Sequence, residues 1–131
     1  MLLHCTYCSA KKKNDPSLLP AIERYSSRRI QYRYEKAKET NVAFAILSGK
    51  LGLLLPSTEI PYYDYLLLTK DIKEHGKIVA KQLKDMHVTN LYYFTASVKA
   101  DPRIKPYMEC IRYACEYNGI TLEIMEENYC D

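Results

Sequence analysis

The first stretch whose residue types and spacing could do chemistry is Cys-Thr-Tyr-Cys at residues 5–8, followed closely by three lysines at residues 11–13. Paired cysteines of this spacing occur in zinc sites and in redox-active disulfides. A zinc site needs four ligands, and the chain has neither a second CxxC nor an HxxxH. A redox CxxC begins a helix, whereas here the first cysteine lies within an apolar run. We therefore predict no metal site and interpret Cys5 as a core residue and Cys8 as the start of a binding loop. The other residues that could serve as zinc ligands are His4, Cys110, Cys115 and Cys130.

The lysines that follow allow two interpretations. Ammonium groups and backbone N–H donors of one short loop together suit an anion such as phosphate. A run of lysines is equally typical of a solvated surface. The sequence contains neither GxxxxGK[ST] nor GxGxxG, so neither standard nucleotide-binding loop is present. The residues alone leave both alternatives open for Lys11 and Lys12.

A second stretch whose residues could bind a ligand reads ILSGKLGLLLPSTEIPYYDY. Ser48 and Lys50 supply a hydroxyl and a charge, and Gly52 permits close approach of the backbone to a ligand. Tyr63 could stack on a nucleobase while Asp64 bonds the edge of the base. The alternative is a buried tyrosine whose hydroxyl bonds a nearby aspartate, and the sequence does not decide between the two.

The elements that must position these residues follow from the hydrophobic pattern. Apolar runs predict strands at residues 1–7, 42–47, 91–95 and 120–125. Amphipathic stretches predict helices at 18–39, with a break near Ser26-Ser27, at 70–86, and from Asp101-Pro102 to Asn118-Gly119. The leucine-rich LGLLLP segment is interpreted as a short helix that folds back over the sheet edge. We predict a single α/β domain over residues 1–131: a three-layer, Rossmann-like fold with a four-stranded, mostly parallel sheet in the order 2-1-3-4.

The loops after the first three predicted strands place the site. Ligands of such sheets bind outside the carboxyl ends of the strands. The first two loops hold the residues named above, and the third holds Ser97 and Lys99, so each loop has a serine and at least one lysine. Because these loops open at one edge, we expect a site there.

Composition narrows the class of protein. The net charge of +3 allows an anionic small molecule, nucleotide or nucleic acid as partner, and no apolar run reaches the length of a membrane span. We expect a cytoplasmic protein, because the lysines follow the first apolar residues in an order unlike that of a signal peptide. Five cysteines in a reducing compartment are then mostly free thiols. No cofactor, oligomeric state or reaction follows from the sequence.

The motifs CSAKK, PAIERY and LSGKLGLLLP with IPYYD resemble a small bacterial and phage family of unknown function. The second half of the pattern is similar to the YaaA family of peroxide-stress proteins. The first half is similar to the lysine-transferring domain of archaeosine synthases. The resemblance covers roughly residues 5 to 70, and Leu51 and Lys13 depart from the residues usual in these families. The matched positions are Cys8, Ser9, Lys12, Tyr25, Ser48, Gly52, Leu53, Pro56, Ile60, Tyr63 and Asp64.

The resemblance implies a site at the carboxyl edge that binds a nucleobase, a nucleotide or the end of a nucleic acid, and it leaves open whether the protein is an enzyme. Lys12 would contact phosphate or act as nucleophile or base, and Ser9 and Ser48 would hydrogen-bond the ligand. Asp64 would orient a base edge or a lysine. The remaining expected ligand-binding residues are Cys8, Lys11, Tyr25, Lys50, Gly52 and Tyr63.

The alternative function is a non-enzymatic DNA-binding or oxidative-stress protein. It would track phosphates with the basic face of the first helix, made of Arg24, Arg28, Arg29, Arg33 and Lys36.

Overall fold

The computed structural model describes residues 1–128, and its centre is a five-stranded sheet in the order β4-β3-β1-β6-β7. The strands are β1 (Leu2–Tyr7), β3 (Ala43–Ser48), β4 (Gly52–Leu54), β6 (Asn90–Thr95) and β7 (Thr121–Glu126). The order predicted for the four main strands is confirmed, and those four are parallel to one another. The predicted count of four is wrong, because β4 adds a fifth strand antiparallel to β3.

The additional strand comes from the leucine-rich segment that we interpreted as a short helix. A turn at residues 49–51 reverses the chain, so that Gly52 pairs with Ser48 and the segment runs back along β3. Gly52 has a φ of +83°, a backbone conformation that side-chain-bearing residues rarely adopt. Leu53 and Leu54 are buried. Backbone pairing with β3 therefore places these leucines in the core without a helix.

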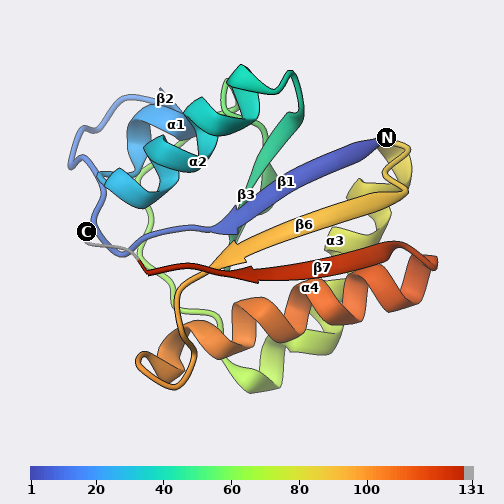
Figure 1. The fold of residues 1–131 in the computed structure, drawn as a ribbon. Helices are drawn as coiled ribbons and strands as arrows, with labels where there is room; N and C mark the ends of the chain where they lie inside the picture. The colour runs from blue at the N-terminus through green and yellow to red at the C-terminus, as the bar shows by residue number, and fades with distance from the viewer. Residues whose placement is uncertain (129–131) are drawn as a thin grey trace.

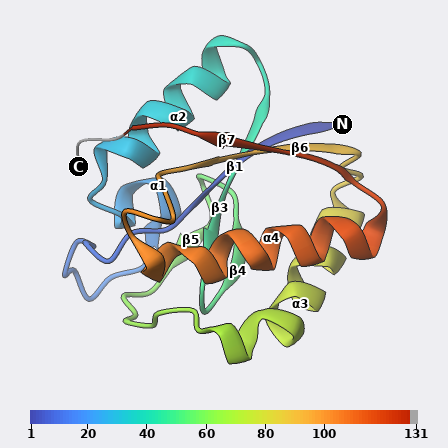
Figure 2. The same ribbon diagram turned by 60° about the horizontal axis from the view of Figure 1, so that its bottom comes forward.

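Helices lie on both faces of the sheet (Figures 1 and 2). On one face α2 (Arg28–Glu39) packs against β1 and β3, and on the other α3 (Ile72–Asp85) and α4 (Lys105–Asn118) pack together. Short 3-10 turns, η1 (Thr69–Asp71) and η2 (Pro102–Ile104), precede α3 and α4. As predicted, α4 stops at Gly119, whose φ is +67°. None of the helices in the described part of the chain is long and apolar enough to cross a membrane.

The helix predicted over residues 18–39 is divided where the break was expected. A four-residue helix, α1 (Ala21–Arg24), ends at Tyr25, which has extended backbone. Ser27 then caps α2 by accepting a hydrogen bond from the Ile30 N–H. The extended residue forms an isolated antiparallel bridge with Lys12. The interruption thus attaches the lysine loop to the body of the protein. Before α1, β2 (Leu19–Pro20) pairs with β5 (Glu59–Ile60) in a separate two-stranded sheet.

Candidate functional site

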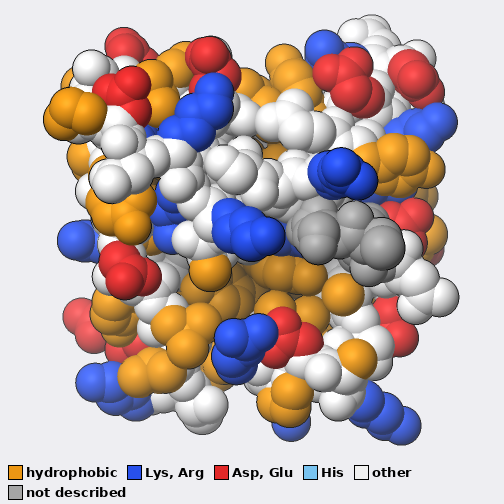
Figure 3. All heavy atoms as spheres, turned by 90° about the vertical axis from the view of Figure 1, so that its left-hand side faces the viewer, with side chains coloured by type: hydrophobic (Ala, Val, Ile, Leu, Met, Phe, Trp, Pro, Cys, Tyr) orange, Lys and Arg blue, Asp and Glu red, His pale blue; other side chains and the backbone are white. Residues whose placement is uncertain are grey.

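A pocket of about 400 Å³ opens where β1 and β6 end. The arrowheads of β1, β6 and β7 point to this side in Figure 1, and Figure 3 views the molecule from it: a hollow with an apolar floor and Lys or Arg side chains at its rim. Four residues expected at the site line the pocket: Cys8, Ser9, Lys12 and Asp64. The other lining residues are Tyr7, Ala10, Arg29, Tyr65, Leu66, Asp101, Arg103, Ile104 and Tyr107.

Lys12 is held in place by its neighbours on both sides. The Lys13 N–H donates to the Arg24 carbonyl at 2.8 Å, and the Ser26 N–H donates to the Lys11 carbonyl at 3.0 Å. The Lys12 ammonium lies over the Tyr63 ring, 4.6 Å from its centroid. No carboxylate of residues 1–128 forms an ion pair with it. The pocket therefore contains a fixed cation that no carboxylate of the described residues neutralises.

A buried cluster of hydroxyls supports this lysine. The Ser48 hydroxyl donates to the Tyr63 hydroxyl at 2.8 Å and accepts from the N–H groups of Lys50 and Leu51. The Tyr63 hydroxyl in turn shares a hydrogen bond of 2.5 Å with Tyr25. Burial raises the pKa of both tyrosines, so the cluster is neutral.

The hydroxyl cluster changes the expected roles of its members. Ser48, Tyr25 and Tyr63 do not line this pocket: the two tyrosine rings lie under the Lys12 ammonium, and Ser48 hydrogen-bonds Tyr63. Tyr25 lines a separate hollow of about 550 Å³ instead. This pocket therefore gives a ligand no direct contact with these three residues. The alternative in which a buried tyrosine bonds Asp64 is also wrong, because Asp64 is exposed and the Tyr63 hydroxyl bonds Ser48 and Tyr25.

Cys8 and Tyr107 form the rear of the pocket. The Cys8 N–H donates to the Leu47 carbonyl at 2.9 Å, which fixes the residue directly after β1. The Tyr107 hydroxyl, on the same wall of the pocket, accepts from the Leu67 N–H at 3.1 Å. Burial raises the pKa of Tyr107, so the hydroxyl keeps its proton. Gly49 leaves room for it, since a Cβ there would lie 2.9 Å from the hydroxyl oxygen.

Arg29 is a pocket residue that we assigned to a different surface. It is 4% exposed, and its guanidinium lies 3.6 Å from the centroid of the Tyr7 ring. One guanidinium nitrogen donates to the Thr6 hydroxyl at 2.6 Å and to the Tyr7 carbonyl at 2.9 Å, and the other donates to the Cys8 carbonyl at 3.1 Å. The sequence shows that this position of the helix is basic, but only the packing of α2 on β1 shows that its charge points inward.

The loop after β6 contributes different residues from those predicted. Ser97 and Lys99 do not line the pocket, whereas Asp101 and Arg103 do. The Arg103 Nε donates to the Asp101 carboxylate at 3.0 Å, and this contact lowers the pKa of the aspartate. Ligands of parallel sheets bind in the loops after the strands, and this rule identified the loop after β6. It does not tell which residues of that loop face the pocket, so it could not select Asp101 and Arg103 over Ser97 and Lys99.

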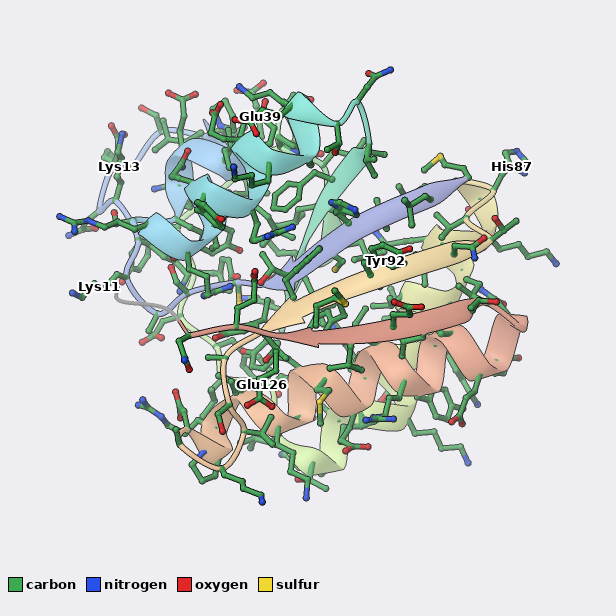
Figure 4. All side chains as sticks on the ribbon, in the orientation of Figure 1. Lys11, Lys13, Glu39, His87, Tyr92 and Glu126 are labelled. Carbon is green, nitrogen blue, oxygen red and sulfur yellow. The ribbon has the colours of Figure 1, made fainter. Side chains whose placement is uncertain are left out.

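Three further expected residues lie outside the pocket. Lys11 is exposed and points away from the protein at the carboxyl edge, as Figure 4 shows. Lys50 is exposed and lines a second, smaller hollow of about 280 Å³. Gly52 lies beside Gln82 at the start of β4, where its conformation serves the strand.

The basic face of the first helix is largely internal. Arg24, Arg29 and Arg33 are buried, whereas Arg28 is exposed and Lys36 is half exposed. Arg24 donates to the carbonyls of a turn and of a neighbouring strand: those of Lys13, Asp15, Ser17 and Ile60. The expectation of a continuous solvent-facing row of arginines is therefore wrong. The guanidinium groups of Arg24 and Arg29 each donate to several carbonyls, whereas that of Arg33 pairs with Glu127 and stacks on Phe94.

The cysteines and histidines do not form a metal centre within residues 1–128. Cys5, Cys110 and Cys115 are buried in the core, and burial raises the pKa of Cys110 to about 12. Cys130 lies outside the described residues. His75 is buried, and its Nε2 hydrogen-bonds the Ser48 carbonyl at 2.8 Å. It therefore positions the turn that carries the hydroxyl cluster.

Comparisons with known proteins returned no relatives. No protein-family model matches the chain, and neither a curated protein nor a solved structure matches it significantly. The resemblance to the YaaA family and to archaeosine synthases therefore rests on the motifs alone and stays a prediction. The pocket holds Lys12, the buried Arg29 and Asp64, which has no partner within residues 1–128, and aromatic rings line its walls.

Proposed function

We propose that the chain binds a nucleobase or nucleotide, free or at a nucleic-acid end, in the pocket at the carboxyl edge of β1 and β6. The observation that carries the proposal is the coexistence in one pocket of an unneutralised Lys12 and an unpaired Asp64. No hydrogen bond or ion pair joins Asp64 to another group of residues 1–128. A nucleotide offers both complementary groups, a phosphate for the ammonium and base N–H donors for the carboxylate.

The walls and the size of the pocket support a flat ligand. About 400 Å³ lies within the range of small-molecule sites, toward its lower end. The rings of Tyr7 and Tyr107 line it together with Ile104, so the walls combine aromatic faces with an apolar edge. Such walls favour a planar heterocycle through stacking.

The charges of the pocket support an anionic ligand. Lys12, Arg29 and Arg103 contribute three positive charges, while Asp64 and Asp101 contribute two negative ones. Arg103 is paired with Asp101, which leaves Lys12 as the group able to meet a phosphate without breaking an ion pair. Lys12 and Asp64 are also the groups that would act on a base, as nucleophile or as proton acceptor, if the bound ligand is a substrate.

The proposal is tested by calorimetric titration of the protein with nucleobases, nucleosides, nucleoside monophosphates and inorganic phosphate. We expect a monophosphate to bind tightest, and Lys12→Ala to weaken it about tenfold, because a charge-assisted hydrogen bond is lost. Asp64→Asn should weaken binding of the base without changing affinity for inorganic phosphate.

Lys11→Ala is the matched control, since it removes a neighbouring lysine that does not line the pocket. Equal affinities of the wild type, Lys12→Ala and Asp64→Asn proteins across the panel would refute the proposal. An equal loss in Lys11→Ala and Lys12→Ala would indicate general electrostatic attraction rather than a pocket.

The alternative, DNA binding through the helical basic face, has less support. Three of its five cations are buried and already donate to or stack on groups of the chain. Binding of that kind would weaken steeply with salt and would depend on Arg28. A duplex-binding assay with Arg28→Ala at two salt concentrations distinguishes it from the pocket.

A further inference from the structure

Tyr65 lies between two hollows at the carboxyl edge. It lines the pocket of about 400 Å³ that contains Lys12, and it also lines the hollow of about 280 Å³ that contains Lys50. Each hollow thus has its own lysine, and one aromatic residue is common to both. A ligand made of two similar units would fill this arrangement better than a single compact molecule.

The position of Tyr65 is fixed by its neighbours. Its hydroxyl donates to the Asp71 carboxylate at 2.6 Å, and the same carboxylate oxygen accepts from the Leu68 N–H at 3.1 Å. The residues on either side are anchored as well: Tyr63 through its hydroxyl, and Leu67 through its N–H. A tyrosine held in this way, yet 39% exposed, presents a ready surface on which a base can stack.

Charge at this edge matches a polyanion. The loops at residues 9–17, 49–51, 61–71 and 96–104 hold seven lysines and arginines against four aspartates. Their formal excess of three equals the net charge of the whole chain, +3. These loops therefore carry more positive than negative charge, and the carboxylates of Glu74 at the second hollow and of Glu127 directly after β7 lie at the same edge.

The surface in and beside the two hollows is apolar as well as basic. Tyr62, Leu66 and Leu68 are 43–48% exposed along the same extended segment that carries Tyr65. Exposed aromatic and aliphatic groups among lysines are typical of surfaces that follow single-stranded nucleic acid, where unpaired bases need stacking partners. Double-stranded DNA offers no free base faces to such residues.

We propose that the physiological ligand is single-stranded nucleic acid, with one nucleotide in the Lys12 pocket and its neighbour in the Lys50 hollow, the two bases meeting the Tyr65 ring. This inference rests on the proposed function, since it extends the ligand of the same pocket. The Lys50 ammonium contacts the second phosphate. The Glu74 and Asp71 carboxylates at the second hollow accept from amino groups of the second base.

The test is a length series followed by calorimetry: a mononucleotide, 3′–5′-linked dinucleotides of RNA and of DNA, a tetranucleotide, a hairpin duplex, and a 5′–5′ pyrophosphate-linked dinucleotide. We expect at least a tenfold gain in affinity from the mononucleotide to the better of the two dinucleotides, because the second unit binds within the same complex. The RNA and DNA arms show which sugar the site takes.

Variants separate the two hollows. Tyr65→Ala should lower dinucleotide affinity about fivefold or more and change mononucleotide affinity less. Tyr117→Ala is the matched control, because Tyr117 is an exposed tyrosine on α4 outside both hollows. Lys50→Ala, on an exposed turn, provides a second probe should Tyr65→Ala fail to fold, and it should reduce the dinucleotide gain alone.

The outcomes are distinguishable. A mononucleotide that binds as tightly as every longer strand overturns this inference and leaves the proposed function intact. Tighter binding of the duplex or of the pyrophosphate-linked dinucleotide also overturns it. If no nucleotide of any length binds, the proposed function fails, and this inference fails with it.

Discussion

The lysines of the 11–13 loop and the arginines of α1 and α2 look alike in the sequence but occupy opposite environments. Lys11 and Lys13 are exposed, whereas Arg24 and Arg29 are 0% and 4% exposed. A guanidinium has five donors in one plane and stacks on rings, so it can satisfy carbonyls inside the protein. An ammonium is a compact, strongly hydrated charge and stays near water. In this comparison the buried arginines carry structural charge, and the lysines carry charge that a ligand can reach.

The two regions also differ in what they hold together. Arg24 hydrogen-bonds three carbonyls of the turn at residues 13–17, and Arg29 hydrogen-bonds the carbonyls at and just after the end of β1. Both segments flank Lys12. The buried arginines thus fix the backbone of the site, while the lysine supplies the group that meets the ligand. The comparison predicts that substitutions of the buried arginines act on stability and that substitution of Lys12 acts on binding.

The largest effect is expected for Arg24→Met. The substitution removes the donors of four carbonyl oxygens, so we expect the free energy of unfolding to fall by about 3 kcal/mol. Urea denaturation measures it. Arg28→Met is the matched control, because Arg28 is exposed and should cost less than about 0.5 kcal/mol. Similar costs for the two variants would remove the distinction between buried and exposed arginines.

A smaller effect concerns His4, which lies on the sheet against the arginine region. Burial, and then the positive charge of Arg33, lower the pKa of His4, and the rings of Tyr92 and Phe94 pack against it. The unfolded chain, with a histidine pKa of about 6.5, therefore binds the proton more tightly than the folded protein does. Stability should be complete above that value and decline as the pH falls below it.

The check on His4 is a pair of stability curves from pH 8 to pH 5. His4→Gln cannot take up the proton, so its curve should fall less steeply than that of the wild type over this range. Parallel curves would show that His4 does not contribute to the acid sensitivity, and that the Arg33 charge is not felt at the imidazole.

The smallest effect on stability is expected for Lys12→Ala, despite its position in the pocket. Its contacts are two tyrosine rings and a long hydrogen bond to the Ala10 carbonyl at 3.5 Å, so we expect a change within about 1 kcal/mol. Thermal and urea unfolding of Lys12→Ala, compared with the control variant Lys11→Ala, provide the measurement. A loss of the size expected for Arg24→Met would mean that Lys12 is a structural residue, which would weaken its proposed role in binding.

Much of the fold could be predicted because it follows from local pattern. Four apolar runs alternate with amphipathic stretches, and this periodicity indicates a parallel sheet whose order the structure confirms. The stop at Gly119 and the break before α2 are also local signals. The strand at Leu53 and Leu54 could not be predicted in this way, because a short leucine run fits a helix or a strand equally and only pairing with β3 decides it.

The candidate site was predicted in part, for an equally physical reason. The rule that ligands meet the carboxyl ends of parallel strands located Cys8, Ser9 and Lys12 correctly at one edge. It does not show which side chain of a loop turns inward. Tyr63 therefore appeared as a stacking residue and lies under Lys12, while Arg103 was overlooked although its loop was identified.

The sequence by itself determined the α/β class and the edge at which polar loops gather, because these depend on hydrophobic period and chain connectivity. Only the tertiary structure decided which charges are internal. Arg29 and Lys12 are both cations near the end of β1, and the packing of α2 against the sheet places one beneath the pocket and the other on its wall. Burial depends on how the helices and the sheet pack together, so the local pattern of basic residues does not predict it.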